Sequence, residues 1–197
     1  MRKFYLSILV CCFLLTGCVV GSIHPFYTPD RVVQRPDLYG RWDFDESRKP
    51  QANSQTIISD GKVTIFDDKG KPLDAKITFF QIEDSLFVDI YPDQGELKVK
   101  LVGDQPPPVH LVALIRLEQD KIRFNELNYD WLSKEVESKR INLRFTRMSE
   151  NTDILFTPTS EEWVEFLKKY RQDPNAFPPD REDYMVRKQE FMMSIPQ

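Results

Sequence analysis

The chain has 197 residues, with 27 Lys and Arg against 31 Asp and Glu and a formal net charge of −4 at pH 7. This length suits a single domain with a sizeable core. Nucleic-acid binders cluster Lys and Arg on one surface, so the acidic balance argues against DNA or RNA as a partner. It also argues against a general electrostatic attraction to anionic lipid headgroups.

The N-terminus has the features of a bacterial export signal. Two basic residues, Arg2 and Lys3, precede an uncharged stretch over residues 4–15 and then two small residues. A membrane-spanning helix needs about 20 apolar residues, and here the apolar character ends at Val20. We therefore expect residues 1–17 to be a cleaved signal peptide.

Residues 15–18 read Leu-Thr-Gly-Cys and resemble the lipobox of bacterial lipoproteins. The resemblance implies cleavage between Gly17 and Cys18 and attachment of acyl chains such as palmitate to Cys18. Cysteine usage agrees, because Cys11 and Cys12 would be discarded and Cys18 would be the only thiol of the mature chain. Two or more acyl chains anchor a protein stably, so the lipid bilayer is the expected partner. The alternative is an ordinary secretory signal with a cysteine nearby.

We expect four segments along the chain. They are a lipoprotein signal peptide over residues 1–17, a lipidated N-terminus and tether over 18–36, a β domain with a C-terminal helix over 37–170, and a polar, Pro-containing tail over 171–197. Cleavage would remove two basic residues and no acidic one, which changes the formal net charge from −4 to −6. The covalent lipid would then supply the attachment to the membrane.

Alternation of apolar and polar residues with a period of two predicts a mainly β domain. The expected strands cover residues 39–44, 56–58, 62–65, 73–79, 86–90, 109–117, 122–124, 141–145 and 154–156. Eight or nine short antiparallel strands favour a barrel or a strongly curved sheet, and the alternative is an α+β fold with an open antiparallel sheet. A barrel of about eight strands can be filled by side chains or can hold one small ligand. The sequence leaves both interiors open.

Two helices are expected in the second half of the chain. Residues 129–138 form a short connecting helix, and a second helix begins after Thr159. Thr159 and Glu162, three residues later, match a capping box. One apolar stripe follows at helical spacing, made of Trp163, Phe166, Leu167 and Tyr170. A helix with this much aromatic area must pack against the sheet.

Residues 40–42, Gly-Arg-Trp, resemble the Gly-x-Trp signature of lipocalins and related calycin barrels, in which the tryptophan plugs the closed end of the barrel. A wider resemblance is carried by residues 24–27, 38–42, 86–89, 129–132 and 157–162. These stretches are similar to a family of bacterial lipoproteins to which no activity is attached. The resemblance implies envelope attachment and a single compact domain, and it transfers no catalytic residues.

The two histidines are the candidates for acid–base catalysis. His24 lies in the expected tether, whereas His110 shares a strand face with Val112 and Leu114. His110 could act as a base if that face lined a pocket, but a structural role is the more common one for such a histidine. Thiol catalysis is excluded if Cys18 is lipidated. We therefore expect no catalytic residue and no enzyme.

Acidic clusters offer no metal or cofactor site. Residues 67–70 lack the alternating oxygen ligands of a calcium loop, and two histidines so far apart give no zinc spacing. Asp43, Asp45 and Glu46 could do acid–base work, yet polar residues at a strand end usually face water.

Aromatic residues could line a ligand cavity or fill the core. The candidates are Phe79, Phe80, Phe87, Tyr91, Phe124, Trp131 and Phe145. Core packing is the simpler interpretation for a small β domain. Phe80 and Phe87 lie out of phase with the main apolar faces, so we expect them under the helix or on a contact surface.

These observations together predict a membrane-anchored lipoprotein of the bacterial envelope that acts as a binding or interaction module. Its partner would be a small hydrophobic ligand or another envelope protein. The alternatives are a structural or assembly factor with a fully packed core and, less favoured, a hydrolase that uses His110. In a Gram-negative cell, Val19 in place of aspartate after Cys18 implies the periplasmic face of the outer membrane, by resemblance to the sorting rule of enteric bacteria.

Overall fold

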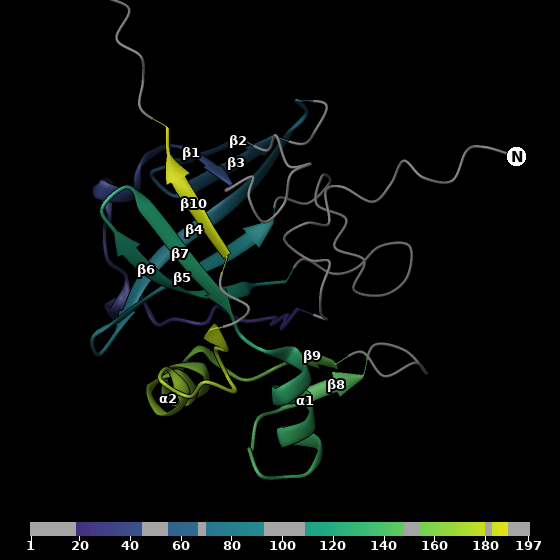
Figure 1. Ribbon diagram of the computed structural model, residues 1–197. Helices are drawn as coiled ribbons and strands as arrows, with labels where there is room; N and C mark the ends of the chain where they lie inside the picture. The colour runs from purple at the N-terminus through teal and green to yellow at the C-terminus, as the bar shows by residue number, and fades with distance from the viewer. Residues whose placement is uncertain are drawn as a thin grey trace, which may run out of the picture.

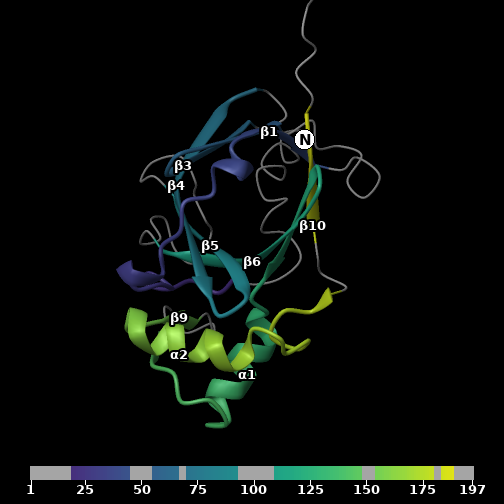
Figure 2. The same cartoon turned by 90° about the vertical axis from the view of Figure 1, so that its left-hand side faces the viewer.

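The computed structural model describes residues 19–44, 55–66, 70–92, 109–147, 154–179 and 183–188. In these ranges the protein is mainly β, with a closed antiparallel barrel of eight strands (Figure 1). A layer of two α-helices and a two-stranded sheet lies against one side of the barrel (Figure 2). The predicted lipocalin-like barrel is therefore confirmed, and the alternative open sheet is wrong.

The barrel is an antiparallel meander. Its strands are β1 (Gly40–Phe44), β2 (Gln55–Ser59), β3 (Lys62–Phe66), β4 (Pro72–Ile82), β5 (Ser85–Pro92), β6 (Leu111–Glu118), β7 (Lys121–Glu126) and β10 (Asp183–Arg187). Strands β1 to β7 pair in chain order, and β10 closes the barrel between β7 and β1. The predicted hairpin at Asp60 and Gly61 joins β2 to β3, with Gly61 at a φ of +67°.

The second layer contains the remaining elements. They are α1 (Tyr129–Glu137), β8 (Phe145–Arg147), β9 (Ile154–Phe156) and α2 (Ser160–Tyr170), while two short 3-10 helices, η2 (Pro29–Arg31) and η3 (Pro36–Leu38), precede β1. Strands β8 and β9 pair with each other in a separate sheet. Among the described residues, no helix is long and apolar enough to cross a bilayer.

Inward-facing side chains of the barrel pack into one continuous core. The buried members of this core are Leu38, Trp42, Ile58, Val63, Ala75, Ile77, Phe79, Val88, Ala113, Ile115, Ile122, Phe124 and Met185. All eight barrel strands contribute to it, with partly buried residues such as Phe44, Leu86 and Ile90 around the edge. A barrel of this size is just wide enough for side chains to fill it.

Strands β4, β5 and β6 are also buried on their outer face. Phe80, Phe87 and Leu114 are cross-strand neighbours on that face, and they belong to a second core cluster together with Trp163 and Leu167 of α2. The rings of Phe80 and Phe87 stack with their centroids 5.4 Å apart. The predicted second buried face under the helix is therefore confirmed.

The Gly-x-Trp motif lies where the barrel closes. The Trp42 side chain is fully buried, and its Nε1 donates a hydrogen bond of 2.9 Å to the Leu38 carbonyl oxygen. The Arg187 guanidinium of β10 lies over the indole at 4.3 Å from the ring centroid, and it donates to the carbonyl oxygens of Tyr39 and Asp37. Gly40 has a φ of +137°, and a Cβ there would lie 3.0 Å from Arg187 Nη1. Gly40 thus makes room for the arginine that covers Trp42.

The structure differs from the expected segments at both ends of the domain. The expected tail over residues 171–197 contains β10, without which the barrel would be open. The expected tether over residues 18–36 is packed from its first described residue, since Val20 and Phe26 are buried in the second core cluster. Both segments look like loops in sequence because prolines interrupt them.

One expected strand is mostly irregular. Of residues 141–145, only Phe145 lies in a strand, because the chain leaves α1 through Lys139 at a φ of +59° and then turns. The amides of Arg140 and Ile141 both donate to the Glu135 carbonyl oxygen. Ile141 is buried in the second core cluster and Leu143 packs against it. Ile141 and Leu143 therefore belong to a loop that packs on the same core cluster as α1.

We expect Arg187→Ala to lower the free energy of unfolding by about 2 kcal/mol, because it removes a cation–π contact and two charged hydrogen bonds. Urea unfolding of the purified domain measures this change. Lys188→Ala is the matched control, since it removes only an exposed ion pair with Asp43 at 3.3 Å and should cost less than about 0.5 kcal/mol. Equal losses from both substitutions would contradict the role of Arg187.

Candidate functional site

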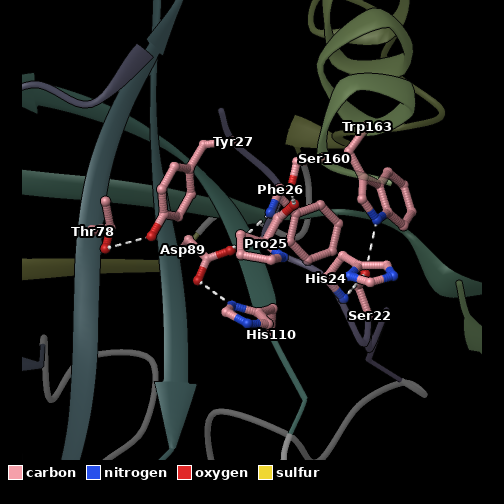
Figure 3. A network of polar contacts seen from close by, with 10 residues as sticks. All are labelled: Ser22, His24, Pro25, Phe26, Tyr27, Thr78, Asp89, His110, Ser160 and Trp163. Atoms are coloured by element: carbon pink, nitrogen blue, oxygen red, sulfur yellow. Dashed lines mark hydrogen bonds and ion pairs between the residues drawn. The ribbon is translucent and has the colours of Figure 1, made fainter. Parts of the chain in front are cut away.

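The candidate site is the N-terminal segment, residues 19–27, together with the groups that hold it between the barrel and the second layer (Figure 3). Its backbone bridges both layers. Ser22 pairs with His110 at the start of β6, with N–H···O distances of 3.0 and 2.8 Å, and it also bridges Phe156 of β9. The N-terminal segment thus links the barrel to the small sheet through isolated β-bridges.

Two further pairs extend this connection. The Gly21 carbonyl oxygen accepts a hydrogen bond of 3.0 Å from the Phe156 amide, and the Ile23 amide donates at 3.1 Å to the Phe156 carbonyl oxygen. Val19 forms an antiparallel bridge with Asn128, which is the N-cap of α1. The first described residue is therefore already paired.

A buried carboxylate holds the far end of the N-terminal segment. Asp89 of β5 is 2% exposed, and its Oδ2 accepts a hydrogen bond of 3.0 Å from the Phe26 amide. Its Oδ1 lies 2.7 Å from His110 Nδ1. This contact joins the carboxylate to one nitrogen of the imidazole ring, and the donor depends on the tautomer of the ring. The Tyr91 ring packs on the imidazole at 4.6 Å between centroids.

Helix α2 supplies the other side of the site. Trp163 Nε1 donates a hydrogen bond of 2.8 Å to Ser22 Oγ, which also accepts from the His24 amide at 3.1 Å. Ser160 Oγ donates to the Pro25 carbonyl oxygen at 2.9 Å. The Phe26 ring lies 4.4 Å from the Trp163 ring between centroids. Polar and aromatic contacts therefore both lock the segment to α2.

The start of α2 is fixed by the predicted capping box. The Glu162 amide donates to Thr159 Oγ1 at 3.3 Å, and Glu162 Oε2 accepts from the Thr159 amide at 2.7 Å. Hydrogen bonds from Arg144 and then from the Thr159 backbone lower the pKa of Glu162. The stabilisation is therefore complete above the ordinary glutamate pKa and is lost as the pH falls through the lowered value. This cap positions Ser160 and Trp163 against the N-terminal segment.

Tyr27 fastens the segment to β4. Its hydroxyl lies 3.3 Å from Thr78 Oγ1, and its ring lies 5.6 Å from the ring of Phe80 between centroids. The chain then continues along the barrel, where the Val33 amide donates to the Phe79 carbonyl oxygen at 2.9 Å. The route to β1 is therefore pinned to the outside of the barrel at several points.

The structure brings together some of the residues considered from sequence and separates others. His110 lies in the site, whereas the His24 side chain is exposed and only its amide takes part. Cys18 and Gly17 lie outside the described residues, as do Asp67, Asp68, Asp45 and Glu46. Asp43 forms an ion pair with Lys188 and is not part of the site.

The aromatic candidates divide between the two cores. Phe79 and Phe124 lie in the barrel core, and Phe80 and Phe87 lie in the second cluster. Trp131 and Phe145 pack against that second cluster, while Tyr91 contacts His110. This distribution agrees with core packing, the simpler of the two interpretations.

Sequence reasoning missed Asp89 as the partner of His110 and Ser22 as the partner of Trp163 in α2. Asp89 had one signal, because it is a carboxylate on a strand whose neighbours Phe87 and Tyr91 face the same way. A charged side chain on a buried face needs a partner. Phe26 is 63 residues and His110 is 21 residues from Asp89 in the sequence. No local sequence pattern reveals contacts over such separations.

The described residues contain no group of three or more His, Cys, Asp or Glu side chains placed to hold a metal ion. Comparison with protein-family models, with curated proteins and with solved structures finds no match for this chain. The functional interpretation therefore depends on the residues themselves.

Asp89→Ala should free the N-terminal segment, because the Phe26 amide and His110 Nδ1 both lose their acceptor in a buried site. We expect a loss of about 2–4 kcal/mol in unfolding free energy and faster hydrogen exchange at the Phe26 amide. Asp89→Asn, which keeps one acceptor oxygen, should lose less.

The matched control is Asp74→Ala, because Asp74 lies on the adjacent strand β4 but its ion pair with Lys62 is half-exposed and worth little. Unchanged exchange at Phe26 in Asp89→Ala would show that this carboxylate does not hold the segment.

Proposed function

We propose that this protein is a lipoprotein of the bacterial cell envelope, anchored by acyl chains on Cys18, and that its barrel is a rigid interaction module. The observation that supports this most directly is the position of the lipobox. The Leu-Thr-Gly-Cys sequence ends directly before Val19, the first residue that the structure describes. Cleavage between Gly17 and Cys18 would leave the lipidated residue directly before Val19, which pairs with Asn128.

The barrel interior favours an interaction through the outer surface. Inward-facing side chains from every barrel strand pack against one another, including bulky ones such as Trp42, Phe79 and Phe124. A small hydrophobic ligand would need a lumen that these side chains occupy. We therefore favour another envelope protein as the partner, which also suits the alternative of a structural or assembly factor.

A hydrolase remains the less favoured alternative. His110 and Asp89 have the geometry of a base oriented by a carboxylate. In the described part of the chain, however, the second oxygen of Asp89 binds the Phe26 amide and the pair lies under the N-terminal segment. These contacts support a structural role for the pair.

The proposed location is the envelope, on the periplasmic face of the outer membrane in a Gram-negative cell. Val19 follows Cys18 where aspartate would direct retention in the inner membrane, by resemblance to enteric lipoproteins. The mature chain would carry no net basic charge, because its formal charge would be −6 after cleavage. Attachment would therefore depend on the acyl chains alone.

Cys18→Ser should abolish incorporation of labelled palmitate and shift the protein from the membrane fraction to the soluble fraction. The double substitution of Cys11 and Cys12 by serine is the matched control, because both residues belong to the discarded segment and their loss should leave labelling unchanged. Equal labelling of wild type and Cys18→Ser would refute the proposal, as would persistence of residues 1–17 in the mature protein.

Native mass spectrometry of the detergent-extracted protein should show the mass of the lipidated mature chain without a further small molecule. The packed barrel core is the reason for this expectation. A denatured sample provides the reference mass. A stoichiometric hydrophobic molecule that is present in the native spectrum and lost on denaturation would instead support a ligand-binding barrel.

A further inference from the structure

We propose that the lipid anchor holds the folded body flush against the bilayer, with the surface around Val19 and Asn128 at the headgroups. This inference rests on the proposed lipidation of Cys18. It differs from the tether that the sequence suggests for residues 18–36, because the described part of this stretch is bound to the body from Val19 onward. The partner of this surface is the lipid bilayer itself.

The distance between anchor and body is set by covalent geometry. Consecutive Cα atoms are 3.80 Å apart, and directly paired residues on antiparallel strands have Cα atoms about 4.5–5.5 Å apart. Because Val19 pairs with Asn128, the Cα atoms of Cys18 and Asn128 are at most about 10 Å apart. Acyl chains buried in the bilayer keep the Cys18 backbone at its surface, so Asn128 must lie there too.

The N-terminal segment has no slack that could lengthen this connection. Val19 is 9% and Val20 is 1% exposed. The next two residues, Gly21 and Ser22, are hydrogen-bonded to Phe156 and His110 on both sides of the segment. A domain held by four consecutive packed residues cannot swing on its anchor as it would on a Gly/Ser linker.

Exposed apolar residues mark a near and a far position relative to the anchor. Ile23 is 43% exposed and is five residues from Cys18, so its Cα is at most about 18 Å from that of Cys18. Leu117 is 36% exposed and lies seven residues along β6 from His110, the partner of Ser22. At 3.3 Å per residue, the Cα atoms of His110 and Leu117 are about 23 Å apart. Figure 1 shows the turn after β6 on the opposite side of the barrel from the start of β6.

The experiment uses the full-length lipidated protein reconstituted in phosphatidylethanolamine–phosphatidylglycerol vesicles. Ile23→Cys and Leu117→Cys each introduce the only free thiol, because the thiol of Cys18 is consumed by the lipid. A fluorophore on each thiol is then exposed to lipids that carry a nitroxide quencher on the headgroup. Both positions are exposed, and circular dichroism confirms that each variant is folded.

We expect quenching at position 23 to be several-fold stronger than at position 117. A 15-residue Gly/Ser linker inserted between Cys18 and Val19 should remove this difference, because it adds an average reach of about 20 Å. The difference should also persist at high salt, since salt screens interactions between charges but does not weaken the burial of acyl chains.

Equal quenching at the two positions would overturn the proposal, and so would a difference that survives the linker or disappears at high salt. Mass spectrometry of the same samples separates this inference from the proposed function. Equal quenching of a protein that carries the lipid leaves the anchor intact and refutes only the fixed orientation. Absence of the lipid refutes the proposed function itself.

Discussion

The arrangement of the two layers depends on the burial of one carboxylate. Asp89 is placed on a face that is covered by the N-terminal segment, where an unpaired charge would cost several kcal/mol. It is satisfied by the Phe26 amide on one oxygen and by His110 on the other. The cost of separating these groups couples the N-terminal segment, β5 and the start of β6, so that none of them can take another position alone.

The central strands are apolar on both faces because both faces are buried. Antiparallel sheets usually bury one face and leave the other in water. Here β4, β5 and β6 face the barrel core on one side and α2 with the N-terminal segment on the other. Phe80 and Phe87 therefore do not indicate an exposed contact surface, because both are buried in the second core cluster and contact the rings of Tyr27 and Phe177, respectively. The second layer thereby stiffens one wall of the barrel.

Local patterns in the sequence predicted where the helices and strands lie. They did not predict which residues contact one another across the fold. Two-residue periodicity located seven barrel strands, and the capping box located α2, because these signals depend on adjacent residues. The strand that closes the barrel was missed because its apolar stretch is only Tyr184 to Val186 within a polar, proline-rich context. The Arg187–Trp42 contact and the Asp89–His110 pair were invisible for another reason. Each joins residues whose proximity is decided by the closure of the barrel and not by any local signal.

The contacts that join the layers also determine how far a lipidated Cys18 can be from the body. Each residue released from the body adds at most about 3.3–3.6 Å of reach. Undocking of the nine residues of the N-terminal segment would therefore give the anchor about 30 Å of additional length, more than the roughly 23 Å along β6 between His110 and Leu117. A lipid-anchored body keeps one orientation only while Ser22 and Phe26 stay bound to β6, β9 and Asp89. The orientation of the body on the membrane thus depends on the stability of the contacts between the N-terminal segment and the two layers.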